Sequence, residues 1–170
     1  YFCLDFPMAM NFGGTRMVMG HEVTHGFDDQ GRKFDGKGVL QEWWEPEVSK
    51  QFEERAQCID KTYSEIEVLP GVKLNGKLTL GENIADFGGI KESFGAYKNW
   101  AKENPSDKPF VEGLTDDQLF FVGFAQGWCT LQSEETTRLR AVTDPHSPPE
   151  QRVNVPLAHF PGFWETYSCG

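Results

Sequence analysis

The sequence has little positive charge and no long hydrophobic run. It contains 16 Lys and Arg against 26 Asp and Glu, which gives a net charge of −10 at pH 7. Without a basic cluster to neutralise phosphates, neither nucleic acid nor an anionic membrane surface is expected as a partner. No stretch approaches the ~20 apolar residues of a membrane-spanning helix. Any membrane attachment would therefore depend on an anchor outside this sequence.

Cysteine is also scarce, and no two cysteines form a C-x-x-C pair. This spacing excludes zinc-finger and thioredoxin-like sites. Two interpretations stay open at this point: reduced thiols in a cytosolic protein, or long-range disulfides in an extracytoplasmic one. The sequence contains no N-glycosylation acceptor, because no asparagine lies in an N-x-S/T motif in which x is a residue other than proline. The sequence contains four cysteines, Cys3, Cys58, Cys129 and Cys169.

The sequence is nevertheless rich enough in apolar residues to fold. Apolar residues make up 38% of the 170 positions, with 14 Phe and 5 Trp. This length and composition predict one domain with one ordinary core, spanning residues 1–170. Neither an initiator methionine nor a signal peptide opens the sequence, so we expect a processed product or a fragment.

Hydrophobic spacing and capping signals predict a mainly α-helical chain with little β structure. Thr115 and Gln118 form a capping box that predicts a helix start. Asn75-Gly76 predicts a turn within residues 68–80, which are expected to form a short hairpin or an extended segment. The proline-rich stretch 143–156 is predicted to be a loop, as is the Gly- and Asp-rich stretch 28–41. Helices are expected over residues 14–27, 46–66, 82–102, 116–131 and 160–167.

The H-E-x-x-H pattern carries the most specific chemistry. His21 and His25 are four residues apart, so on a helix both imidazoles lie on one face and can reach one ion. Zn²⁺ binds such neutral nitrogens and keeps an open position for water in catalytic sites. Glu22 beside the first histidine is positioned to take a proton from that water. The alternative is a pair of hydrogen-bonded core histidines.

A third ligand separates the classes of zinc peptidase. The metzincin extension requires Gly at position 28 and His at 31, but Asp28 and Gly31 stand there, so that class is excluded. Glu82 would instead complete a His₂Glu site. Asp86, one helical turn further, would accept the ring N–H of a ligand histidine and raise its basicity. The alternatives are a helix-start glutamate for Glu82 and a solvated carboxylate for Asp86.

Two further residues are candidates for substrate handling. His146 lies in a D-P-H-S-P loop whose prolines restrict the backbone, and it would donate to a developing oxyanion. Arg152 is a permanent cation able to bind a carbonyl or a carboxylate by two hydrogen bonds. From spacing alone, a surface histidine and a surface arginine remain open as alternatives.

These motifs occur in longer strings that resemble the catalytic C-terminal portion of the neprilysin and endothelin-converting enzyme family of zinc metallopeptidases. The resemblance covers nearly the whole sequence and keeps the family's order and spacing. The strings are NFGGTRMVMGHEVTHGFDDQGRKFDGKG, QEWWEP, LNGKLTLGENIADFGG, AYKNWAK, QLFFVGFAQGWC and TDPHSP.

The resemblance implies a thermolysin-like helical subdomain that binds one Zn²⁺ per chain. It implies cleavage of peptides on the amino side of bulky apolar residues, in an apolar S1′ pocket. Gly127 stands where relatives carry a larger pocket residue, so a wider pocket is expected. The implied roles are zinc ligands His21, His25 and Glu82, general base Glu22, histidine partner Asp86, oxyanion donor His146, backbone-binding Arg152, and pocket residues Met17, Val18 and Trp128.

The resemblance also implies parts that this sequence does not contain. These are an N-terminal lobe that would contact the site, a substrate-binding strand just upstream, and the last residues of the family. Cys58, Cys129 and Cys169 match family positions that bridge to such segments, which favours an extracytoplasmic location. The alternative function is a non-catalytic zinc-binding or interaction module of the same fold.

Overall fold

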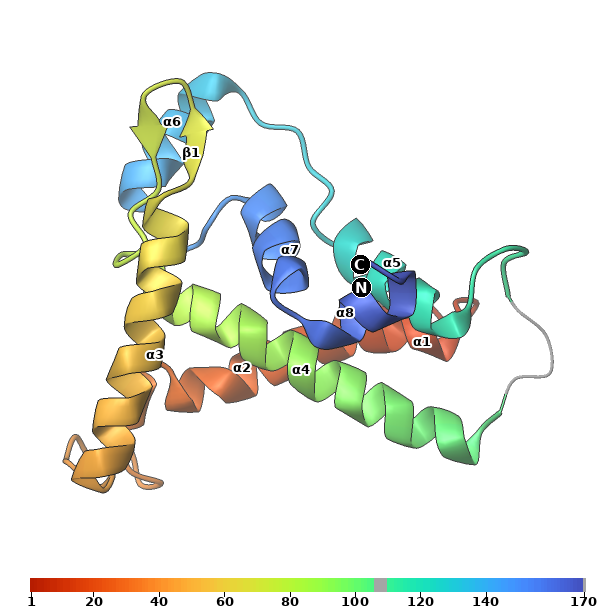
Figure 1. Ribbon diagram of the computed structural model, residues 1–170, viewed down its shortest axis with the longest axis horizontal. Coiled ribbons are helices and arrows are strands. Elements are labelled where there is room, and N and C mark those ends of the chain that lie inside the picture. The colour runs from red at the N-terminus through yellow and green to blue at the C-terminus, as the bar shows by residue number, and fades with distance from the viewer. Residues whose placement is uncertain (106–109, 170) are drawn as a thin grey trace. The chain divides into compact units, whose positions relative to one another are not determined.

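The computed structural model describes residues 1–105 and 110–169, and within them the chain is mainly helical with one short hairpin (Figure 1). This confirms the predicted fold class. In chain order the helices are α1 (Met8–Asn11), α2 (Met17–Thr24), α3 (Pro46–Ser64), α4 (Leu80–Glu103), α5 (Asp116–Gln126), α6 (Glu134–Thr143), α7 (Pro149–Ala158) and α8 (Pro161–Tyr167). The strands are β1 (Glu67–Leu69) and β2 (Val72–Lys73).

The chain divides into two compact units. The first comprises Tyr1–Glu22, Asp86–Thr130 and Pro149–Gly170, and the second comprises Val23–Ala85 and Leu131–Pro148. Helices α2 and α4 each contribute residues to both units.

The first unit has a core of aromatic side chains. Phe12, Phe120, Phe121 and Phe124 are each at most 2% exposed, and Tyr97 stacks on Phe120 with ring centroids 5.7 Å apart. Aromatic side chains bury large areas and favour such offset and edge contacts. A turn of π-helix, Phe12–Arg16, packs against α5 in this core and leads directly into α2. The core therefore fixes the start of the helix that carries His21.

Two glycines let α2 approach α4 closely within the first unit. A Cβ added to Gly89 would lie 2.7 Å from the Met17 carbonyl oxygen and 2.9 Å from the His21 backbone nitrogen. A Cβ on Gly20 would lie 3.1 Å from the Gly89 Cα. A Cβ at Gly89 would require the α2 backbone to shift, whereas one at Gly20 would make a tight contact. The close approach places His21 directly beside α4.

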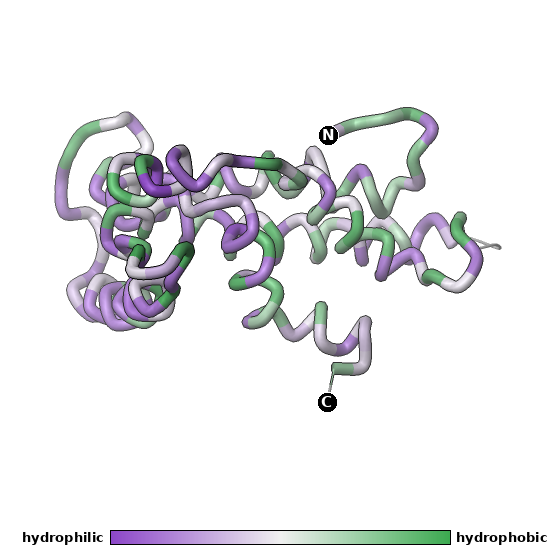
Figure 2. Tube along the Cα trace, turned by 90° about the horizontal axis from the view of Figure 1, so that it is seen from above, coloured by the Kyte–Doolittle hydropathy of each residue, from purple (hydrophilic) through white to green (hydrophobic). Residues whose placement is uncertain are grey.

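The N-terminal segment of the first unit is held by a buried asparagine. The Asn11 side chain accepts from the Cys3 backbone N–H at 3.0 Å and donates to the Cys3 carbonyl at 2.9 Å. The residues just after the N-terminus are mostly hydrophobic (Figure 2), and two of them, Phe2 and Leu4, are exposed.

The second unit contains α3, which leads into the hairpin, and α6, which packs against the hairpin (Figure 1). Pro46 occupies the first turn of α3, where its missing N–H costs nothing. Arg32 fixes the preceding loop to α3: its guanidinium lies 4.9 Å from the Phe52 ring centroid and 2.9 Å from the Glu53 carboxylate. The unit thus joins the segment after His25 to a long amphipathic helix.

Several predicted elements need correction. The hairpin turn lies at Pro70-Gly71, where Gly71 has φ +75°, and not at Asn75-Gly76. The stretch 143–156 is not all loop, because α7 begins at Pro149, a residue that suits a first helical turn. Helix α6 was not predicted, although Ser133 caps it by accepting from the Thr136 N–H.

Within the described residues, no helix is long and apolar enough to cross a membrane.

Candidate metal centre

His21 is buried on α2 and hydrogen-bonded to α4. Its Nδ1 lies 2.9 Å from Oδ1 of Asp86, a carboxylate with 0% exposure. Because a carboxylate on Nδ1 fixes the tautomer, Nε2 is the nitrogen that would coordinate a metal ion.

Arg152 on α7 completes this buried network. Its Nε and Nη2 atoms donate to the two carboxylate oxygens of Asp86, each at 2.8 Å. Its guanidinium also lies 4.1 Å from the Trp128 ring centroid. A bidentate pair that is stacked on an indole fixes both groups. Arg152 therefore fixes Asp86, and Asp86 orients His21.

His25 begins a short 3₁₀ turn, His25–Phe27, and has its own carboxylate partner. Its Nδ1 lies 2.7 Å from Oδ2 of Asp28, whose Oδ1 accepts from the backbone N–H groups of Gln30 and Gly31. Asp28 is 6% exposed, and a Cβ on Gly81 would lie 3.2 Å from its Oδ2. The glycine leaves room for the carboxylate, and two amides hold it against His25.

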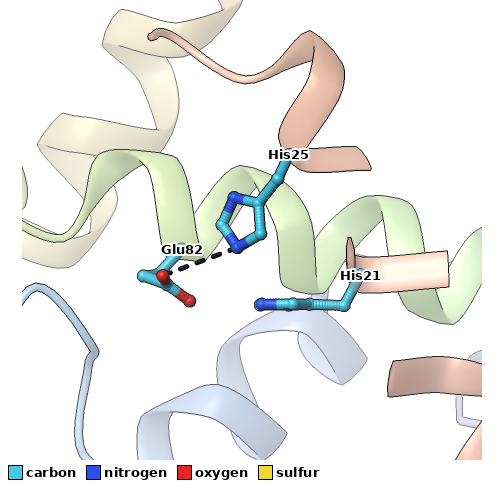
Figure 3. Close-up of side chains that lie close together, drawn as sticks. All are labelled: His21, His25 and Glu82. Carbon is cyan, nitrogen blue, oxygen red and sulfur yellow. Dashed lines mark ion pairs between the residues drawn. The ribbon is translucent and has the colours of Figure 1, made fainter. Parts of the chain in front are cut away.

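Three side chains form a group that fits a metal ion. The ligand atoms of His21, His25 and Glu82 all lie within 4.8 Å of one another, and Figure 3 shows the two rings and the carboxylate pointing toward one another. His25 Nε2 is 3.5 Å from Glu82 Oε1. Ligands about 2.1 Å from one tetrahedral ion lie roughly 3.4 Å apart, so this pair has the spacing of two zinc ligands. Two imidazoles and a carboxylate are one of the donor sets found in catalytic zinc sites.

His146 lies close to the same glutamate. Its Nε2 is 3.3 Å from Glu82 Oε1, its Nδ1 is 2.8 Å from Asp144 Oδ1, and its side chain is 41% exposed. Burial by itself raises the pKa of Asp144. Hydrogen bonds from the His146 backbone and ring and from Arg140 outweigh this effect and lower the pKa to about 2. Asp144 is therefore ionised at neutral pH and orients the His146 ring.

The remaining predicted residues have different environments. Glu22 is exposed on α2, beside His21. Met17 is 1% exposed and belongs to the hydrophobic core, while Val18 and Trp128 are partly buried. The space that Gly127 leaves is not open, because a Cβ there would lie 2.8 Å from the Tyr1 ring. The Tyr1 side chain therefore lies against Gly127.

Two aspartates of this region were not predicted from the sequence. Asp28 follows His25 by three residues and Asp144 precedes His146 by two, so both pairs are local. The signals that would have revealed them are the Asp-x-x-Gly turn after His25 and the Asp-Pro pair before His146, since aspartates in tight turns accept nearby backbone N–H groups.

Comparison with known proteins places this geometry in a family. The model of peptidase family M13 matches residues 1–170. The chain belongs to peptidase family M13. It is 48% identical to neprilysin-1 of Caenorhabditis elegans over 173 residues, covering 99% of this chain and 23% of that protein. It is 44% identical to human endothelin-converting enzyme 1 over 170 residues, covering 99% of this chain and 22% of that protein.

Solved structures of similar fold agree with the family. The crystal structure of the zinc metalloprotease Zmp1 of Mycobacterium tuberculosis with an inhibitor superposes with a TM-score of 0.94 at 36% identity, covering 100% of this chain and 26% of that one. The Haemonchus galactose-containing glycoprotein complex gives 0.90 at 37% identity, with 99% and 28% covered. The chain thus spans about a quarter of the length of these M13 relatives.

Proposed function

We propose that the intact protein carrying this chain is a zinc-dependent endopeptidase that hydrolyses peptides. The observation that carries the proposal is the group His21, His25 and Glu82, whose ligand atoms lie within 4.8 Å of one another. Each histidine has an aspartate on Nδ1, at 2.9 Å for His21 and 2.7 Å for His25. Membership of family M13 supports the same activity.

In the proposed mechanism these three residues hold one Zn²⁺. When bound, the ion supplies Lewis acidity toward the scissile carbonyl and lowers the pKa of water in the open position. Glu22 accepts the proton of the attacking water and passes it to the leaving amine. His146, oriented by Asp144, donates a hydrogen bond to the oxyanion. Asp86 keeps His21 in the tautomer that coordinates through Nε2.

We further propose that substrates bind with a bulky apolar residue on the primed side. Val18 on α2 and Trp128 just after α5 are partly buried, and Trp128 packs against the core that contains Met17. Arg152 contacts the substrate backbone through its guanidinium. Because Arg152 stacks on Trp128, backbone binding and side-chain binding would share one rigid surface.

We also propose that the intact protein works outside the cytoplasm, with an N-terminal lobe as its intramolecular partner. Cys58, Cys129 and Cys169 are exposed, as needed for disulfides to segments outside this chain. Peptide mapping of the non-reduced protein tests this arrangement. Disulfides at these three positions would support it, and three reduced thiols would contradict it.

The test of the activity is the Glu22→Gln substitution in the intact protein. Turnover of a quenched peptide with an apolar P1′ residue should fall at least ~10²-fold, since general acid–base catalysis contributes 10²–10⁴. Zinc content should stay at one ion per chain. Glu54→Gln, on the exposed face of α3, is the matched control and should keep full turnover. Undiminished hydrolysis in Glu22→Gln would remove Glu22 as the base. An unaltered protein that binds zinc but cleaves nothing would indicate a binding module.

A further inference from the structure

A chain of wholly buried polar side chains runs through the second unit beside the proposed centre. Ser147 donates to Asn83 Oδ1 at 2.7 Å, and Asn83 Nδ2 donates to Thr79 Oγ1 at 2.9 Å. Thr79 Oγ1 in turn donates to the Asn75 carbonyl at 3.3 Å. The exposures are 1% for Ser147, 0% for Asn83 and 1% for Thr79. None of these groups has a role in the proposed mechanism.

Two of these buried side chains are sequence neighbours of residues of the proposed centre. Ser147 immediately follows His146, and Asn83 immediately follows Glu82. The hydrogen bond between Ser147 and Asn83 therefore ties the histidine loop to the first turn of α4. The separation that it controls is the 3.3 Å between His146 Nε2 and Glu82 Oε1.

Holding His146 in place requires such a tie. Its side chain is 41% exposed, so core packing does not fix it. Asp144 accepts from the His146 backbone N–H at 2.9 Å and contacts the ring, which orients the imidazole relative to its own loop. It does not set the distance of that loop from α4. Ser147, at the other side of the histidine, does.

We propose that Ser147 and Asn83 are positioning residues that hold His146 in register with Glu82 through their buried hydrogen bond. Apolar residues of similar size would fill the same space, whereas a satisfied buried polar pair specifies one arrangement. Thr79 supports Asn83 by fixing its amide orientation. The inference rests on the proposed function only in the role that it gives to His146.

Hydrogen exchange in the intact, metal-free protein tests the tie without reference to activity. Ser147→Ala should cause a loss of protection in the segment 144–148, because the loop opens from α4 more often. Thr115→Ala is the matched control: it removes a hydroxyl that caps α5 and should leave this segment unchanged. Unchanged protection of residues 144–148 in Ser147→Ala would overturn the proposal.

A double-mutant cycle tests the link to His146. Ser147→Ala should lower kcat about tenfold with KM nearly unchanged, less than the 10²–10³ for removing an oxyanion donor outright. In a His146→Ala background the same substitution should cause no further loss. Additive losses would overturn the proposal, because Ser147 would then act independently of His146.

A second variant guards against general unfolding. Ser147→Cys keeps the side chain nearly the same size and replaces the hydroxyl by a weaker donor. It should give a smaller loss of kcat in the same direction, again absent in the His146→Ala background. Failure of the unaltered protein to cleave any peptide would refute the proposed function, while the exchange experiment would still decide the tie between Ser147 and Asn83.

Discussion

At the scale of single residues, every imidazole of the proposed centre has an aspartate on Nδ1. Asp86 serves His21 at 2.9 Å, Asp28 serves His25 at 2.7 Å and Asp144 serves His146 at 2.8 Å. Carboxylates in this position set the tautomer and raise ligand basicity. The aspartates therefore orient the proposed ligands and His146 without coordinating the ion themselves.

Replacing Asp28 should weaken metal binding. In Asp28→Ala, His25 loses its partner, and zinc affinity should fall about 10–100-fold. Competition with a chromogenic chelator measures the change. The matched control is Asp35→Asn, since Asp35 also accepts two backbone N–H groups, from Lys37 and Val39, but has no histidine beside it. Equal zinc affinity in Asp28→Ala and the unaltered protein would show that Asp28 does not support the ligand.

Asp144 should contribute a pH-dependent part of the stability. Its pKa is about 2 in the folded protein against an ordinary value of 3.8, so its contribution is present above pH 4. The contribution is lost as the pH falls through the folded pKa. The difference in melting temperature between the unaltered protein and Asp144→Asn should shrink as the pH falls from 5 toward 2. A difference that is constant over this range would contradict the lowered pKa.

At the scale of secondary-structure elements, the contact of α2 with α4 determines where His21 meets Asp86. Gly89 makes this contact possible, because the His21 backbone nitrogen lies 2.9 Å from where a Cβ would be. His21 lies on α2 and Asp86 on α4, so the hydrogen bond joins the two helices. The glycine thus contributes to the geometry of the site without touching a ligand side chain.

Adding a methyl group at this crossing should both destabilise the protein and weaken zinc binding. Gly89→Ala should cost about 1–3 kcal/mol of unfolding free energy through overpacking. Gly95→Ala in the same helix is the control, because nothing lies within 4 Å of its Cβ position, and it should stabilise by about 0.5–1 kcal/mol. Calorimetry and chelator competition measure the two effects. A Gly89→Ala protein as stable as the Gly95→Ala control would contradict the close crossing.

Sequence patterns predicted these elements unevenly. The spacing of Val48, Phe52, Ala56 and Ile59 predicted α3, because an amphipathic face leaves a periodic signal. The helix α7 was missed because Pro149 begins it and Pro156 lies inside it, although Pro149 is compatible with a first turn. The hairpin turn was misplaced because Asn75-Gly76 and Pro70-Gly71 are both turn signals, and only strand pairing decides between them.

The sequence predicted some residues of the proposed site but not the long-range contacts that hold them. The four-residue spacing of His21 and His25 follows from ligand geometry on one helix. Glu82 lies far away in the sequence and was expected from its spacing with Asp86 and from the family resemblance. Contacts between residues far apart in the sequence, such as Arg152 with Asp86 and Ser147 with Asn83, leave no local pattern. The structure was needed to find them.

At the scale of the whole molecule, the chain is about a quarter of the length of its relatives. We expect zinc to stabilise the intact protein by mass action, because the ligands come together only in the folded chain. At a free zinc concentration 1,000 times Kd, the gain should be about 4 kcal/mol. Thermal unfolding with and without zinc measures it, and His21→Ala should abolish the gain. A gain that persists in His21→Ala would show that the metal binds elsewhere.

The identity of the metal ligands is tested most directly by zinc K-edge X-ray absorption on the intact, zinc-loaded protein. We predict two imidazole nitrogens and carboxylate or water oxygens at about 2.0–2.2 Å, with no sulfur shell. His25→Ala, like His21→Ala, should lose the bound zinc and its absorption edge with it. A sulfur shell near 2.3 Å would place the metal on the cysteines instead and would contradict the His21, His25 and Glu82 centre.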